Sequence, residues 1–518
     1  MQVRRVGPFA GVTVVVAGLA AGGAVPPWPG VVHLVGLPPL DLFADARVLL
    51  VLAPSWPWFA VGLAGVVAVR VMVLAMLLGG LHRWRRAALC YGLALPPLLL
   101  AAQLDYMAYA LRYSRLFWPA AALAIAVVLT LAPSPWRTGG GGRVSERPEV
   151  QARVERRASS VPGRFAVLVP YAVVVTVLGV AAGRGGWVAV ALVPVSAVAT
   201  LVAGAALARP ARPARRWTVV PLAVLTGAAG VAFVVTRGGP DAPYPPVRAG
   251  SLVLMSGINS ASGKGAVFRT DVRRLGFTCA QTYYVSYAGP GGGAARGEAA
   301  CPIRGGAPYG PSSTRRPVRE QVDAFAAQVR GLPEPVTVVA LSQGAWVAWE
   351  AVASGRAPGV RTLVLAGPFG GRSLGYRAPG DDGPGRVAGD LLRALAALAG
   401  RAGFAFAPDS PGARELLGTA GAGGAILARP VPDGVRTMAV TSTTDLPLTP
   451  SAWRLNVDRN ACPVRANHSA LPTAPGFARQ VGRFLDGAGA PRCPRWRAWG
   501  APMIEPFGVP IVDAVTYR

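Results

Sequence analysis

The residues best suited to chemistry form a small-residue turn around Ser342. The sequence from Ala340 to Gly344 is Ala-Leu-Ser-Gln-Gly, so a small residue stands two positions before the serine and another two positions after it. Small residues are needed where a strand turns sharply into a helix, because the two backbones crowd each other. Such a turn projects its central side chain at the N-terminus of the helix. Ser342 is therefore a candidate nucleophile; the alternative is a serine in an ordinary strand-to-helix loop.

Histidine is scarce in this chain, which restricts the choice of a base for Ser342. A serine hydroxyl becomes a strong nucleophile when a neighbouring base accepts its proton. The chain has 3 histidines, and His33 and His82 lie in its oily N-terminal half. His468 follows Ser342 in the sequence, in a loop before a final amphipathic segment. We expect His468 to be the general base; the alternative is a histidine in a surface loop.

A carboxylate is needed to orient the imidazole and to stabilise its protonated form. Asp445 comes just after the apolar run 435–441 and precedes a proline-bearing turn. Asp433 precedes the same run and would lie at the opposite end of a strand. Asp458 is the runner-up, but its neighbours are polar, as in a solvated loop. We predict that Asp445 is the acid of a Ser-His-Asp triad.

Backbone amides beside Ser342 could hold the negative charge that develops on a substrate carbonyl. The first donor would be the N–H of Gln343, at the start of the predicted helix. The second would come from the small-residue loop 256–265, in which Ile258 and Asn259 are both candidates. This loop is glycine-rich, but it lacks the spacing of a phosphate-binding loop and a Ser or Thr after its lysine. We expect no nucleotide, no other cofactor and no metal ion.

These residues together resemble a known family. The turn at 340–344, Asp445 after a late strand, and the run His-Ser-Ala-Leu-Pro from His468 make the region 250–490 similar to an α/β-hydrolase of the lipase/esterase kind. The resemblance implies Ser342 as nucleophile, His468 as general base and Asp445 as orienting acid. The sequence departs from the family in having alanine at the first position of the turn. It also lacks a His-Gly pair after the first strand, so the second oxyanion donor stays open.

Alternating strand and helix patterns supply the scaffold that would position these residues. Strands are expected at 251–257, 281–287, 336–341, 362–366 and 435–441, and helices at 264–276, 317–331, 345–355, 385–400 and 475–485. Such alternation predicts a mostly parallel, doubly wound sheet, and ligands bind at the carboxyl ends of its strands. The segment 370–434 interrupts the pattern; a lid over an acyl pocket and a plain surface excursion are both compatible with it.

The N-terminal half has the composition of a membrane protein. The chain has 518 residues, of which 52% are hydrophobic and 15% charged. We expect a multi-pass α-helical membrane domain at 1–236, a linker at 237–250 and an α/β-hydrolase domain at 251–518. The seven expected spans are 8–25, 57–80, 87–111, 116–133, 165–183, 186–208 and 217–236. The first of them could instead be a cleaved signal peptide.

Arginine is concentrated in alternate connections between these apolar stretches. Basic residues favour the cytoplasmic side of a membrane. This places the N-terminus in the cytoplasm and the C-terminal domain outside, at the plasma membrane. Arg70 and Asp105 lie within expected spans, where charged residues are candidates for a transport or relay role.

Cysteine usage supports an external location for the C-terminal half. Four of the 5 cysteines fall there: Cys279, Cys301, Cys462 and Cys493. An even number confined to one domain indicates two disulfides and an oxidising compartment. Pairing between sequence neighbours, Cys279 with Cys301 and Cys462 with Cys493, is the hypothesis, and the other connectivities stay open.

The net charge of +28 comes almost entirely from arginine. No basic stripe alternates with aromatic residues, so a nucleic-acid partner is not expected. A basic domain beside a lipid bilayer favours anionic or interfacial substrates. The sequence thus predicts a membrane-anchored, extracytoplasmic serine hydrolase that cleaves a lipid or cell-envelope acyl ester. Acyl transfer by the same triad, an inactive binding or sensor module, and a transporter or scaffold built on the membrane half are the alternatives.

Overall fold

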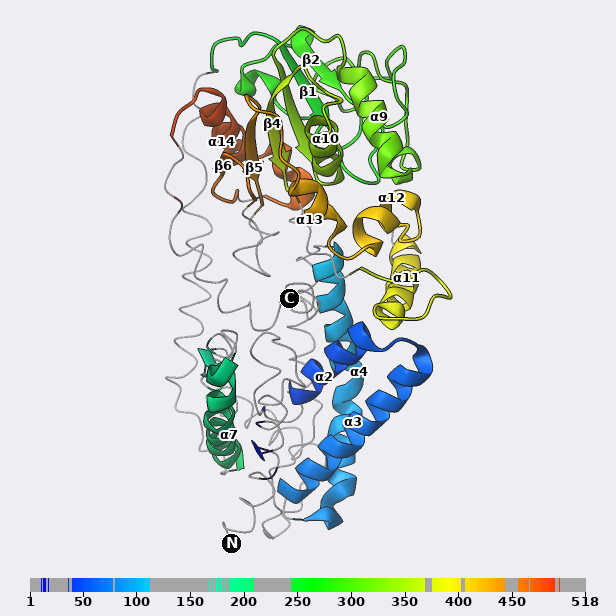
Figure 1. Cartoon of the computed structure of the whole chain (residues 1–518), viewed down its shortest axis with the longest axis vertical. Coiled ribbons are helices and arrows are strands. Elements are labelled where there is room, and N and C mark those ends of the chain that lie inside the picture. Colours follow the sequence, from blue (N-terminus) through cyan, green and yellow to red (C-terminus); the bar gives the residue numbers. More distant parts are fainter. Residues whose placement is uncertain are drawn as a thin grey trace, which may run out of the picture.

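A six-stranded parallel sheet forms the centre of the C-terminal half (Figure 1). The computed structural model describes residues 40–77, 80–111, 186–208, 244–368, 375–401, 406–442, 455–464, 466–489 and 493, with single positions before residue 40 and between 167 and 181. The strands lie in the order β2-β1-β3-β4-β5-β6, and every neighbouring pair is parallel. Their bounds are Ser251–Met255 (β1), Thr282–Tyr284 (β2), Val336–Leu341 (β3), Val360–Ala366 (β4), Arg436–Val440 (β5) and Arg459–Asn460 (β6). The parallel sheet expected for this half is therefore present.

Helices cover both faces of the sheet, which explains why its central strands have no polar face. Every residue of β1 and β3 is buried. Helices α9 and α10 lie on one face, while α14 lies on the other (Figure 1). The short 3₁₀ helix η4 packs against α14. The bounds of these helices are Val318–Val329 (α9), Gln343–Ala353 (α10), Pro475–Leu485 (α14) and Val272–Leu275 (η4).

The helix expected at 264–276 is reduced to the single turn η4. Asp271 begins this turn by accepting a hydrogen bond from the N–H of Arg273 at 3.2 Å. Gly276 ends it in a left-handed conformation, with φ of 82°. A capping side chain and a terminating glycine five residues apart leave room for no more than one turn.

An insertion of helices between β4 and β5 connects the sheet with the N-terminal part of the chain. It contains α11 (Arg386–Arg401), α12 (Pro411–Ala413), the π-helical turn η7 (Arg414–Gly418) and α13 (Ala422–Leu427). Helix α13 packs against α10, and α12 packs against the 3₁₀ turn η6 (Ser313–Arg315). Helix α11 lies at the other end of the insertion and contacts α2, α3 and α4 (Figure 1). The segment expected to be a lid or an excursion is thus a connection between the two halves.

Three N-terminal helices pack around a partly buried ionic cluster: α2 (Leu40–Leu52), α3 (Trp56–Leu77) and α4 (Trp84–Leu111). The short helix η2 (Leu81–Arg83) lies between α3 and α4 in the chain, and α7 (Gly186–Ala208) is a further helix of this half. Arg70 on α3 pairs with Asp41 at 3.1 Å and with Asp45 at 2.8 Å, both on α2. Tyr91 on α4 donates to Asp41 at 3.1 Å. Arg70 therefore holds α2 against α3 and serves in packing.

The contact between α11 and the N-terminal helices is apolar at its centre and hydrogen-bonded around it. Val387 is fully buried in a cluster with Leu50 on α2 and Ala102 on α4. The Gln103 amide donates to the carbonyl of Ala388 at 3.1 Å. Backbone N–H groups of Gly383 and Gly385 donate to carbonyls of Pro54 and Val51 at 2.8 and 2.7 Å. These bonds fix the start of α11 to the end of α2.

The prediction of a seven-span membrane domain is wrong. Among the described residues, one helix is long and apolar enough to cross a membrane, namely α3 through Trp56–Met76. Helix α4 uses much of its apolar surface for packing, because Tyr91 and Leu98 are buried against neighbouring helices. The apolar run Val190–Ala206 of α7 is shorter than the roughly 20 residues that a bilayer requires. The other expected spans are 8–25, 116–133, 165–183 and 217–236. Apart from single positions, they lie outside the described residues, and so does the alternative signal peptide at 8–25.

Candidate active site

Ser342 lies at the sharp junction between a strand and a helix. Strand β3 ends at Leu341 and α10 begins at Gln343, so a single residue makes the turn. The backbone of Ser342 has φ of 56° and ψ of −123°, a conformation that a residue with a side chain rarely adopts. Its N–H donates to the carbonyl of Ala366 at the end of β4, at 2.9 Å. The elbow expected from the sequence is therefore formed, while the nucleophilic role of Ser342 stays a prediction.

Glycines on both sides of the turn explain why small residues were required there. A Cβ placed on Gly344 would lie 2.6 Å from the carbonyl oxygen of Ser256, in the loop after β1. A Cβ placed on Gly257 would lie 2.8 Å from the Cβ of Ser342 and 3.3 Å from its Oγ. The β1 loop can press against the elbow because neither glycine has a side chain. Ala340, two residues before Ser342, is fully buried within β3.

The structure distinguishes between the two candidates for the second oxyanion donor. Asn259 has a positive φ of 60°, and its N–H donates to the Oγ1 of Thr314 at 2.9 Å. Within the described residues, the N–H of Ile258 has no hydrogen-bond acceptor in the protein. An N–H that is not engaged inside the protein can serve a substrate, so the geometry favours Ile258. Gln343 is the first residue of α10, where helical N–H groups have no acceptor within the helix.

A buried polar network supports both proposed donors, and sequence reasoning missed it. The side-chain amide of Gln343 donates to the carbonyl of Thr314 at 2.7 Å and to the Oε1 of Gln321 at 2.6 Å. Gln321 in turn donates to the carbonyl of Arg316 at 2.6 Å. Thr314 therefore holds Asn259 through its hydroxyl and Gln343 through its carbonyl. One signal was available, because Gln321 is a polar residue on the buried face of α9.

Two tyrosines lie beneath the β1 loop. The hydroxyl of Tyr287 donates to the carbonyl of Ser256 at 2.6 Å, and Tyr309 hydrogen-bonds Ser260 at 3.2 Å. Burial raises the pKa of Tyr287 well above its ordinary value and raises the pKa of Tyr309 to about 12. Both phenols are therefore protonated at neutral pH and act as hydrogen-bonding supports for the loop.

His468 begins the 3₁₀ helix η9 (His468–Thr473) at the carboxyl end of the sheet. Val464 makes a parallel bridge with Ser442, just past the end of β5, and His468 follows four residues later. Leu471 and Pro472 are buried and anchor the turn. His468 and Ser342 thus both follow strand ends at the same edge of the sheet, while the role of His468 as the base stays a prediction.

The structure rejects both alternatives to Asp445 as the acid. Asp458 accepts hydrogen bonds from the N–H and the Oγ1 of Thr437, at 2.7 and 3.1 Å. Thr437 stands at the start of β5, at the edge of the sheet opposite Ser342. Asp433 is exposed at that same edge. Asp445 itself lies outside the described residues, so its role stays a prediction.

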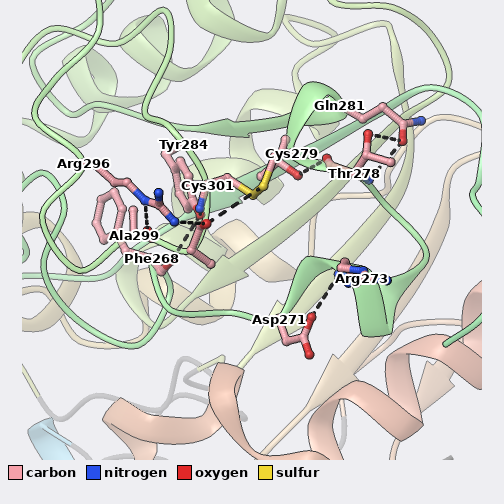
Figure 2. The surroundings of a disulfide bond; sticks show 12 residues. Phe268, Asp271, Arg273, Thr278, Cys279, Gln281, Tyr284, Arg296, Ala299 and Cys301 are labelled. Carbon is pink, nitrogen blue, oxygen red and sulfur yellow. Dashed lines mark hydrogen bonds between the residues drawn. A yellow bond between two sulfur atoms is a disulfide. The ribbon is translucent and has the colours of Figure 1, made fainter. Parts of the chain in front are cut away.

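Both hypothesised disulfides are present. Cys279 is bonded to Cys301, and Cys462 is bonded to Cys493. Figure 2 shows the first bond, beside Tyr284, whose hydroxyl accepts from the N–H of Cys301 at 3.3 Å. The second bond joins the residues before His468 to the chain beyond α14, so it restrains both ends of the segment that carries the histidine.

Comparisons with known proteins leave the family of this chain open. No family model matches the sequence, and no curated protein matches it. Within the described residues, no group of three or more His, Cys, Asp or Glu side chains could hold a metal ion. Among solved structures, the chain is similar to the RedJ thioesterase of the prodiginine biosynthetic pathway in Streptomyces coelicolor. That likeness has 18% identity and a TM-score of 0.26, over 48% of this chain and 91% of the thioesterase.

Proposed function

We propose that this chain is a serine hydrolase that cleaves a carboxylic ester through an acyl-enzyme on Ser342. The observation that carries the proposal is the backbone of Ser342, held at φ of 56° between β3 and α10 with Gly257 against its side chain. Strained residues of this kind persist where the surrounding structure holds them, and they cluster at active sites. A serine that served only packing would gain nothing from such a conformation.

In the proposed reaction, the Oγ of Ser342 attacks the acyl carbonyl while His468 accepts the hydroxyl proton. The N–H groups of Gln343 and Ile258 stabilise the negative charge on the carbonyl oxygen. His468 then donates its proton to the leaving alkoxide, and the acyl group stays on Ser342. Water attacks this acyl group while His468 accepts its proton. His468 then donates that proton to the Oγ of Ser342 as the bond to the acyl carbon breaks, and the carboxylic acid leaves. Asp445 is proposed to orient the imidazole throughout.

We also propose that α3 attaches the enzyme to the plasma membrane, with the sheet-containing half outside the cytoplasm. Large apolar side chains on α3 are exposed, including Trp58 at 67%, Val61 at 67% and Val69 at 53%. Lipid would remove this surface from water, which is favourable. The two disulfides fit an oxidising compartment. The substrate would then be an acyl ester of a lipid or of the cell envelope.

Labelling of the full-length protein with a fluorophosphonate probe tests the proposed nucleophile. We expect labelling of the wild type and of Ser354→Ala, an exposed serine at the end of the same helix, but none of Ser342→Ala. His468→Ala and Asp445→Asn should slow labelling by about 10³- to 10⁴-fold, whereas Asp458→Asn should leave its rate unchanged. A folded wild-type protein that is not labelled would favour a binding module instead of an enzyme. A labelled Ser342→Ala would show that another residue is the nucleophile and would refute the role of Ser342.

A further inference from the structure

Arg315 lies against the loop that carries the proposed oxyanion donor. Its Nε and Nη2 atoms donate to the Oδ1 of Asn259 at 3.2 and 2.9 Å. Asn259 follows Ile258 directly and stands two residues after Gly257, the glycine that touches Ser342. Arg315 also follows Thr314, whose carbonyl accepts from the side chain of Gln343 at 2.7 Å. The guanidinium group is thus held against the β1 loop, and the backbone of Arg315 directly follows the residue that binds Gln343.

The charge of Arg315 has no counter-ion in the part of the chain that the structure describes. Its acceptor is the neutral amide oxygen of Asn259, and no described carboxylate lies within ion-pair distance. The side chain is half-buried, whereas the neighbouring Arg316 is exposed. Partial burial of an unpaired charge is unfavourable, and an anionic ligand would offset that cost.

One edge of the guanidinium group is left for such a ligand. A guanidinium has five N–H groups on two usable edges, and Asn259 occupies the edge formed by Nε and Nη2. The other edge, formed by Nη1 and Nη2, presents two parallel N–H groups. This spacing matches the two oxygens of a carboxylate or a phosphate.

The surroundings favour an anion over a neutral ligand. From residue 251 to residue 316 the sequence contains eight basic residues and two acidic ones. Both acidic residues are paired with arginines, Glu298 with Arg269 at 3.0 Å and Asp271 with Arg274 at 3.4 Å. Neither of these carboxylates is therefore available to Arg315, and the segment as a whole has an excess of basic residues.

We propose that Arg315 binds an anionic group of the substrate, a carboxylate or a phosphate, while Ser342 attacks an ester in the same molecule. This inference rests on the proposed esterase function and defines its substrate class. The two parallel N–H groups of Arg315 would orient the substrate as well as attract it. If Arg315 only supported the β1 loop through Asn259, its loss would slow hydrolysis of every substrate equally. If it also binds the anionic group, its loss should slow hydrolysis of anionic substrates more than that of neutral ones.

Three 4-nitrophenyl esters of similar chain length test the proposal: the neutral butyrate, the hemisuccinate, which carries a carboxylate, and the 3-phosphonopropionate, which stands in for a phosphate. We expect Arg315→Ala to lower kcat/KM about tenfold to a hundredfold more for the preferred anionic ester than for the butyrate, mainly through KM. Arg315→Gln, which can still donate to Asn259, should show the same loss of selectivity. Arg316→Ala, at the exposed neighbour, should change all three rates by less than about twofold.

The outcomes separate this inference from the function on which it rests. Equal losses on all three esters in both Arg315 variants would show that Arg315 only supports the loop, and the proposal would be overturned while the esterase stands. The relative losses on the carboxylate and phosphonate esters identify the preferred anion. A wild-type protein that hydrolyses none of the esters would remove the proposed function, and this inference with it.

Discussion

Replacement of Gly257 by alanine is the sharpest test of the geometry around Ser342. An added Cβ would stand 2.8 Å from the Cβ of Ser342 and 3.2 Å from the carbonyl oxygen of Leu341. Ordinary contacts between such atoms begin near 3.4 Å, so the β1 loop must move away from the elbow. The loop carries Ile258 at the next position, so the proposed donor must move with it.

The expected loss of activity follows from this displacement. Loss of one oxyanion donor lowers kcat about 10²- to 10³-fold, which corresponds to about 3–4 kcal/mol. The overpacking itself should lower the free energy of unfolding by about 1–3 kcal/mol. Gly257→Ala should therefore remain folded at moderate temperature while turning over 4-nitrophenyl butyrate far more slowly than the wild type.

Gly310→Ala is the matched control, because a Cβ on Gly310 would meet no atom within 4 Å. This variant should keep the wild-type kcat, and its free energy of unfolding should lie within about 0.5 kcal/mol of the wild-type value. Steady-state hydrolysis and denaturant unfolding give both quantities on the same samples. If Gly257→Ala kept full activity and stability, the β1 loop could not lie against Ser342, and the assignment of Ile258 would be refuted.

Two further predictions concern the supports of the site. Gln321→Leu should lower kcat by about tenfold and stability by about 1–3 kcal/mol, because it leaves the buried amide of Gln343 with Thr314 as its remaining acceptor; an unchanged kcat in ester hydrolysis would contradict this. Joint replacement of Cys279 and Cys301 by alanine should lower the free energy of unfolding by about 3 kcal/mol, because their bond closes a segment with a sequence separation of 22. Urea unfolding measures that loss, and the variant should then respond to reductant less than the wild type does.

The elbow could be predicted from sequence because its cause is local. Crowding between a strand and the helix that follows demands small residues at fixed positions, and Ala340 and Gly344 supplied that pattern. The disulfides were predictable for a similar reason, since each joins cysteines that are neighbours among the four. By contrast, Thr314 and Asn259 are 55 residues apart. A hydrogen bond between residues so far apart leaves no local pattern in the sequence from which it could be predicted.

Two other failures have physical reasons. The strand β6, Arg459–Asn460, has two residues. It is too short to show an alternation of apolar and polar residues, so it could not be predicted from the sequence. The membrane spans were overcounted because hydropathy does not distinguish apolar groups that face lipid from apolar groups that face protein. Ala102 lies in the expected span 87–111, yet it is buried with Val387 of the insertion.

The docking of α11 onto α2 and α4 has a consequence for how this protein can be divided and recombined. A fragment that starts after the linker would keep α11 but lose the helices that cover Val387, and it would expose an apolar surface to water. A fusion of the sheet-containing half to a different membrane segment would expose the same apolar surface, unless the new segment covered it. For engineering, the two halves should therefore be kept together, because the insertion packs one against the other.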